Sequence, residues 1–178
     1  MGRYFDELAR SMEYISQDNH SIFLGQAVAV DGTAMRNTLA NVPIERLLEV
    51  PVEEDFQLGI SIGLALHGYT PISIFPRWNF LLLATNQIVN HLDKLKEIIG
   101  PNQRSKVVIR TGIGSVRPLH PGPQHTGDFT GAFKLMCPNI DVVRLDNSND
   151  IFPAYQKAFE REDGISSILV EWSDKYND

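Results

Sequence analysis

The chain has 178 residues, of which 43% are hydrophobic and 21% are charged, a length and composition typical of one globular domain with its own core. Its formal net charge of −6, with no run of basic residues, argues against nucleic-acid and anionic-membrane surfaces. The single cysteine, Cys137, excludes an internal disulfide, and the acidic N-terminal helix pattern does not match a signal peptide, so we expect a cytoplasmic location.

The first half of the chain alternates between helical and strand patterns. Apolar residues spaced three and four positions apart in residues 4–15 are typical of an amphipathic helix. Thr33 is a suitable N-cap for a short helix that contains Met35 and Leu39. The other predicted elements of this half are strands at residues 22–25, 47–52 and 71–75, and a helix at residues 54–66 that ends at Gly68.

The second half begins with the longest predicted helix, residues 78–99, which Gly100 and Pro101 terminate. A strand predicted at residues 106–110 leads into the glycine- and proline-rich segment TGIGSVRPLHPGPQHTGDF. A loop of this length inside a domain is usually functional or disordered. The remaining predicted elements are helices at residues 129–136 and 151–161 and strands at residues 141–145 and 167–171.

This alternation predicts an α/β fold: a doubly wound, mostly parallel sheet with helices on both faces. We expect a single domain over residues 1–178, because no repeat, low-complexity segment or linker interrupts the pattern. In such sheets ligands bind at the carboxyl ends of the strands. Glu54 and the loop that follows Arg110 both come directly after predicted strands, so both are expected at that edge.

The segment VPVEEDFQLGISIGLALHG, residues 50–68, combines acids at a helix start with glycines along the helix. Glu53 is best explained as an acid that stabilises the helix N-terminus. For Glu54 this explanation and a functional role are equally open. Gly59 and Gly63 indicate close packing on one helix face, either inside the domain or across a subunit interface.

Aromatic and histidine side chains near the same edge are further candidates. Phe80, beside Trp78, is either a core residue or a platform for stacking on a flat heterocycle. His125 lies in the long loop, where a catalytic role gains weight over a structural one. His120, His125 and Asp128 make only a weak metal-ligand pattern, so no metal site is assigned.

Three arginines and the cysteine complete the candidates. Arg77, Arg110 and Arg117 are each able to bind a phosphate or carboxylate, and equally able to pair with acids of the same chain. Cys137 is most simply a small buried hydrophobic residue.

The spacing from Glu54 to Gly59 and Gly63 resembles the fingerprint of the pyrimidine-binding domain of thiamine-diphosphate enzymes: a Glu, four residues, a Gly, an apolar residue, two residues and a Gly. The stretches IFLGQAV, VPVEEDFQLGISIGLALHGYTPI and RWNFLLLATNQIVNHLDK resemble the beta subunit of 2-oxo-acid dehydrogenase decarboxylase components. HPGPQHTGDF resembles the histidine loop of transketolases and deoxyxylulose-phosphate synthases. The resemblance runs from about Phe5 to Glu171.

The resemblance implies roles for four of the candidates. In that family a Glu hydrogen-bonds the ring nitrogen of the cofactor's aminopyrimidine, which would make Glu54 both catalytic and cofactor-binding. Phe80 would stack on the pyrimidine, with Trp78 beside it in the cofactor site. His125 would be catalytic, reaching toward the substrate or the charge that develops on the cofactor adduct.

Departures from the family pattern imply a partner. The Gly-Asp-Gly that marks the family's Mg²⁺ and diphosphate site is absent, the family's Gly-Glu turn has become Gly25-Gln26, and no transketolase C-terminal domain follows. The resemblance therefore implies a stand-alone pyrimidine-binding subunit, with thiamine diphosphate and Mg²⁺ held mainly by a diphosphate-binding partner. A hetero-oligomer with a homodimeric core is expected.

The expected substrate is a small ketose or 2-oxo acid, and the expected reaction makes or cleaves a carbon–carbon bond next to a carbonyl. The loop sequence favours transketolase-like ketol transfer over 2-oxo acid decarboxylation. The alternative is a non-catalytic regulatory or structural subunit that retains the fold and the interface. A flavodoxin-like nucleotide binder would have only the expected sheet topology in its favour.

Overall fold

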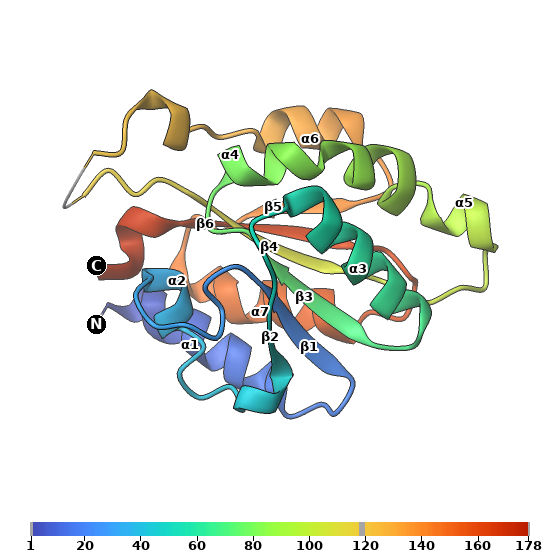
Figure 1. Cartoon of the computed structure of the whole chain (residues 1–178), viewed down its shortest axis with the longest axis horizontal. Coiled ribbons are helices and arrows are strands. Elements are labelled where there is room, and N and C mark those ends of the chain that lie inside the picture. The colour runs from blue at the N-terminus through green and yellow to red at the C-terminus, as the bar shows by residue number, and fades with distance from the viewer. Residues whose placement is uncertain (1, 118–119, 178) are drawn as a thin grey trace.

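The computed structural model describes residues 2–117 and 120–177, in which six strands form one parallel sheet with the order β2-β1-β3-β4-β6-β5. Helices cover both faces of this sheet (Figure 1), which confirms the predicted α/β class. The strands are β1 (Ser21–Gly25), β2 (Leu47–Glu49), β3 (Thr70–Ile74), β4 (Val108–Ile113), β5 (Asp141–Arg144) and β6 (Ser167–Trp172).

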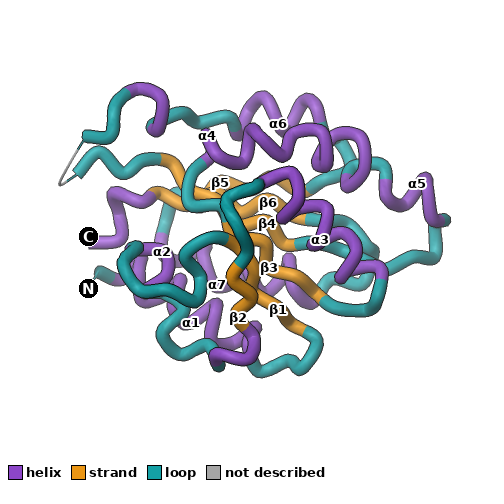
Figure 2. Tube along the Cα trace, viewed as in Figure 1, coloured by secondary structure: helices purple, strands orange, loops and turns teal. Residues whose placement is uncertain are grey.

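Two groups of helices lie on opposite sides of the strands (Figure 2). Helices α1, α2 and α7 contribute to one hydrophobic core, and α3, α4, α5 and α6 contribute to the other. The described helices are α1 (Arg3–Ser16), α2 (Ala34–Asn37), α3 (Glu54–Leu66), α4 (Trp78–Leu81), α5 (Leu95–Ile99), α6 (Thr130–Met136) and α7 (Ser148–Glu160).

The side chains of the central strands contribute to both hydrophobic cores. In β3, Ile72 and Ile74 face the α1 and α7 core, while in β4 the neighbours Val108 and Ile109 belong to opposite cores. The side chains of a strand point alternately to the two faces, so a central strand must be apolar on both. All four residues are at most 2% exposed.

The sheet order places a crevice between β1 and β3. The connection after β1 leads to its neighbour β2 on one side, whereas the connection after β3 leads to its neighbour β4 on the other side. Ligands of open α/β sheets bind where adjacent strands send their connections in opposite directions, at the carboxyl ends. The crevice beyond Gly25 and Ile74 is therefore the first place to look for a site.

The prediction of one regular helix over residues 78–99 is wrong. The chain forms α4, a 3-10 turn at Leu82–Ala84, a π-helical segment at Gln87–Leu92 and then α5. The backbone N–H of Asp93 reaches back five residues to the carbonyl of Ile88, at 2.8 Å. The Asp93 carboxylate accepts from the backbone N–H of Asn139 at 2.8 Å, so a distant contact fixes the end of the wide turn.

Two strand predictions need correction at their ends. The strand predicted at residues 47–52 stops at Glu49 and is a largely exposed edge strand that pairs with β1. Strand β4 continues to Ile113, because its whole length pairs with β6. The long loop therefore starts at Gly114, and two of its residues, 118 and 119, lie outside the described residues.

Candidate functional site

The first turn of α3 is anchored on the carboxyl ends of β1 and β3. The buried side-chain amide of Gln57 donates to the carbonyl of Ile74 at 3.0 Å and to the carbonyl of Leu24 at 3.4 Å. It also donates to the hydroxyl of Ser73 at 3.1 Å, which in turn accepts from Ser61 at 3.0 Å. These bonds join the helix to two adjacent strands, so the start of α3 has a fixed place over the crevice.

Glu54 is the first residue of α3 and is only 4% exposed. Its Oε1 accepts a hydrogen bond from Nε2 of Gln26, the residue that follows β1, at 3.0 Å. Its Oε2 has no hydrogen-bond partner among the described residues. A buried carboxyl with one oxygen held and one oxygen free, at the positive end of a helix, is suited to bind a polar ligand group.

Phe80 and His125 form a second group at the same edge. Their ring centroids are 5.6 Å apart with an edge-on geometry, and both side chains are partly buried. Nη1 of Arg77 donates to the carbonyl of His125 at 3.0 Å, and Oδ1 of Asn79 accepts from the N–H of Gly127 at 3.3 Å. The segment that enters α4 therefore holds the histidine loop at two points.

Nδ1 of His125 is a further polar atom without a partner: it is buried and makes no hydrogen bond in the described part of the chain. A buried ring nitrogen without a partner is costly, and such atoms concentrate where a ligand supplies the missing bond. The structure thus joins Phe80 to His125 and Glu54 to Gln26 as two pairs at one edge of the sheet.

Trp78, predicted to bind a cofactor, has a different position. Its side chain is fully buried in the core and packs on Phe133, with ring centroids 4.9 Å apart. In this conformation Trp78 has no surface that a ligand could contact. Trp78 therefore packs the start of α4 against the core, and Phe80 is the aromatic residue of α4 that remains available for contact with a ligand.

The glycine face of α3 is open to solvent. A Cβ atom built on Gly63 would meet no atom within 4 Å, and one built on Gly59 would meet only the end of Gln87, at 3.9 Å. Two large apolar side chains nearby are exposed, Val52 at 74% and Phe56 at 50%. The glycines are therefore not needed for packing inside this chain, which excludes the first of the two explanations that the sequence left open.

The three residues of the weak metal pattern, His120, His125 and Asp128, are not gathered into one cluster. Among the described residues no group of three or more His, Cys, Asp or Glu is placed to hold a metal ion. Asp128 instead accepts from the N–H of Thr130 at 2.9 Å and pairs with Arg144 at 3.0 Å. Burial alone would raise the pKa of Asp128, but these hydrogen bonds and the Arg144 charge hold it below its usual value.

Two of the candidate arginines have acidic partners. Arg110 is fully buried on the α1 and α7 side of the sheet, where Nε contacts Oε1 of Glu171 at 2.5 Å and Nη2 contacts Oε2 at 3.0 Å. Nη1 donates to Thr38 at 2.8 Å. Burial disfavours its charge, but the Glu171 carboxylate raises the pKa of Arg110 above its usual value. Arg117 pairs with Asp174 at 3.9 Å, so each of the two arginines has an acidic partner within the same chain.

Cys137 is fully buried, as the sequence predicted. Burial raises the pKa of its thiol to about 11, with the Asp93 carboxylate adding to the effect. The thiol therefore stays protonated at neutral pH and has no nucleophilic role.

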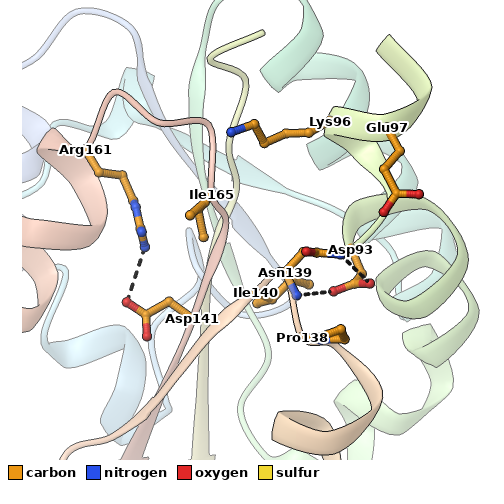
Figure 3. A pocket seen from close by; sticks show the side chains of 9 residues that line it. All are labelled: Asp93, Lys96, Glu97, Pro138, Asn139, Ile140, Asp141, Arg161 and Ile165. Atoms are coloured by element: carbon orange, nitrogen blue, oxygen red, sulfur yellow. Dashed lines mark hydrogen bonds and ion pairs between the residues drawn. The ribbon is translucent and has the colours of Figure 1, made fainter. Parts of the chain in front are cut away.

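A hollow of about 390 Å³ lies at the opposite edge of the sheet, where β5 begins (Figure 3). Several of its polar and charged side chains contact one another: Arg161 contacts Asp141 at 3.3 Å, and Asp93 accepts from Asn139. The ammonium group of Lys96 donates to the carbonyl of Asp163 at 2.7 Å. These groups join helices to β5 and to the segments that lead into β5 and β6, and they do not belong to the site around Glu54.

The comparisons with known proteins show the family to which the chain belongs. The family model described as "Transketolase, pyrimidine binding domain" matches residues 8–177. The chain is 32% identical over 143 residues to the pyruvate dehydrogenase E1 component subunit beta of Gracilaria tenuistipitata var. liui, covering 78% of this chain and 43% of that protein. It is 30% identical over 141 residues to the mitochondrial subunit of the same name from Homo sapiens, covering 78% and 38%.

A solved structure described as a split-gene transketolase in an inactive β4 tetramer has a similar fold. The TM-score is 0.66 at 17% identity, over 94% of this chain and 50% of that one. The chain spans less than half the length of the two pyruvate dehydrogenase relatives. The described residues include no helix long and apolar enough to cross a membrane.

Proposed function

The chain belongs to the transketolase pyrimidine-binding domain family, and on that premise we propose that it is the pyrimidine-binding subunit of an enzyme that uses thiamine diphosphate. The observation that carries the proposal is Glu54: a buried carboxyl with Oε1 held by Gln26 and Oε2 free, over the crevice between β1 and β3. That is where this fold binds ligands.

The side chains at this edge suit the aminopyrimidine half of the cofactor. Glu54 would present its free Oε2 to the ring nitrogen, Phe80 offers an aromatic surface, and Nδ1 of His125 is a polar atom without a partner in the described residues. When bound, the cofactor supplies the carbanion chemistry next to a carbonyl carbon. The tasks of this chain are to orient the cofactor, to hold the proton and to exclude water.

The diphosphate half needs a second subunit. The described residues provide no cluster of metal-ligand side chains, so Mg²⁺ and the diphosphate are assigned to a partner. The open face of α3 that carries Phe56, Gly59 and Gly63 is the contact surface proposed for a homodimeric core of that hetero-oligomer. A cytoplasmic location remains our expectation from the sequence.

The reaction is proposed to be transketolase-like ketol transfer, as the histidine loop favours, or 2-oxo acid decarboxylation. The comparisons include both a split-gene transketolase and pyruvate dehydrogenase subunits. Each is a carbon–carbon bond reaction next to a carbonyl, so Glu54, Phe80 and His125 would keep the same roles in either case.

Native mass spectrometry of the protein purified from its own source tests the proposal. We expect a complex with a partner of different mass that carries Mg²⁺ and thiamine diphosphate. A homo-oligomer that takes up no cofactor would contradict the proposal. It would favour the second candidate, a regulatory subunit, for which the observation in favour is that Gln26 stands where the family has an acid.

A further inference from the structure

The turn after β1 is wrapped around a carboxylate. Glu49, the last residue of β2, accepts from three successive backbone N–H groups: Oε1 from Ala27 at 2.5 Å, and Oε2 from Val28 at 2.9 Å and Ala29 at 2.8 Å. A carboxylate that accepts several backbone N–H bonds fixes the local backbone. Gln26 enters this turn directly after the last residue of β1.

The turn needs that support, because its backbone conformation is unfavourable. Ala27 has a φ of +53°, and every other described residue with a positive φ is a glycine. The left-handed region is costly for a residue with a Cβ atom. The bonds to Glu49 compensate for this cost, so Glu49 and the shape of the turn depend on each other.

The result is a fixed direction for the side chain of Gln26. Its amide nitrogen reaches Oε1 of Glu54, which is 28 residues away in sequence, and the backbone beside it is held by Glu49. Gln26 donates this bond through its amide nitrogen, so Oε1 of Glu54 is the acceptor. An acid at residue 26 could instead share a proton with Glu54.

We propose that Glu49 and Gln26 are positioning residues that direct the proton of Glu54 to Oε2. Oε1 accepts from Gln26, so in the protonated carboxyl Oε1 is the carbonyl oxygen and Oε2 carries the hydrogen. This inference rests on the proposed function, since Oε2 is the oxygen assigned to the cofactor's ring nitrogen. The amide also ends any proton path at Glu54, because Gln26 cannot ionise.

The test is an NMR titration of the Glu54 side-chain carboxyl carbon in the full chain without cofactor, with Glu54→Gln used to assign the signal. The Gln26→Met variant keeps the side-chain length and removes the donor, so the pH of half-ionisation should rise by about one pH unit. Glu49→Gln should move it in the same direction, because the turn no longer holds Gln26 against Glu54.

Glu53→Gln is the matched control, since Glu53 is exposed and makes no side-chain cap bond. Removing either Glu49 or Glu53 deletes one negative charge, which alone makes Glu54 easier to ionise. An upward change for Glu49→Gln and a downward or absent change for Glu53→Gln supports the proposal. Equal downward changes in the two variants, or no change in Gln26→Met, overturns it.

Gln26→Glu serves as a second variant if Gln26→Met does not fold, and it should also raise the pH of half-ionisation, because the two carboxyl groups would compete for one proton. An unchanged midpoint in this variant would equally overturn the proposal. The titration needs neither cofactor nor partner. Its failure is therefore distinct from failure of the proposed function, which would appear as a purified complex that lacks thiamine diphosphate.

Discussion

Replacing Gly63 separates packing inside the chain from packing between chains. Gly63 lies in the interior of α3, and a Cβ atom there meets nothing within 4 Å. Alanine in the interior of a helix is more favourable than glycine by about 0.5–1 kcal/mol. With no clash to offset that gain, Gly63→Ala should raise the free energy of unfolding of the isolated chain by about this amount.

The assay is urea unfolding followed by circular dichroism, at a protein concentration where the chain is monomeric. Gly131→Ala in α6 is the matched control, because its Cβ would also meet nothing within 4 Å. If the glycine face is an interface, Gly63→Leu should weaken assembly of the purified complex, measured by sedimentation velocity, while Gly131→Leu should not.

Two results would refute this reasoning. Destabilisation of the isolated chain by Gly63→Ala would mean that the glycine contacts another part of the same chain. Unchanged assembly in Gly63→Leu would remove the α3 face from the proposed homodimeric core.

Three further predictions concern the core and the histidine loop. Arg110→Met leaves the fully buried Glu171 carboxylate without its cation, so it should lower the free energy of unfolding by about 3–5 kcal/mol in a urea titration; a loss below about 1 kcal/mol would contradict the ion pair. Arg77→Met removes the donor to the His125 carbonyl, so amide hydrogen exchange in the loop around His125 should accelerate, and Arg77→Lys should restore part of the protection; equal protection in all three proteins would exclude this clamp. Burial raises the pKa of the Cys137 thiol to about 11. The neutral thiol therefore contributes its full stability below the pKa of the unfolded chain, and this contribution is lost as the pH rises toward 11. The free energy of unfolding should fall less between pH 9 and 11 in Cys137→Ala than in the wild type, and equal falls would contradict the raised pKa.

Helices whose ends are set by local interactions could be predicted from the sequence. Helix α3 begins and ends at the predicted residues, because an acid stands at its start and Gly68, with φ of +88°, follows its last turn. Thr33 caps α2 as predicted, accepting from the N–H of Arg36 at 3.0 Å. In both cases the deciding interaction lies within a few residues of the element.

Features set by distant contacts were not accessible. The break between residues 78 and 99 depends on Asp93 and Asn139, which are 46 positions apart. The side chain of Trp78 is buried because Phe129 and Phe133, at and in the start of α6, pack against it. The sequence around an aromatic residue near a strand end is the same whether the side chain faces a ligand or the core. Local sequence patterns therefore predict neither the break in the helix nor the burial of Trp78.

The partners of the candidate site residues were also missed. The sequence singled out Glu54 but treated Gln26 only as a departure from a family pattern, and it gave no role to Glu49 or Asn79. The contacts of Gln26 and Glu49 require the β1, β2 and β3 register, which pairs Gly25 with both Glu49 and Ile74, and the contact of Asn79 requires the histidine loop to return to α4. A signal was present for one of them, since residue 26 directly follows the strand predicted at residues 22–25, whereas residue 49 lay inside the strand predicted at residues 47–52.

The central claim is that Glu54 contacts the cofactor. Calorimetric titration of thiamine diphosphate with Mg²⁺ into the complex of this chain and its partner tests it most directly, comparing wild type, Glu54→Ala and the control Glu53→Ala. Loss of one hydrogen bond to a charged or strongly polar group should weaken binding by about tenfold or more in Glu54→Ala alone. Equal affinity in all three proteins would contradict the account.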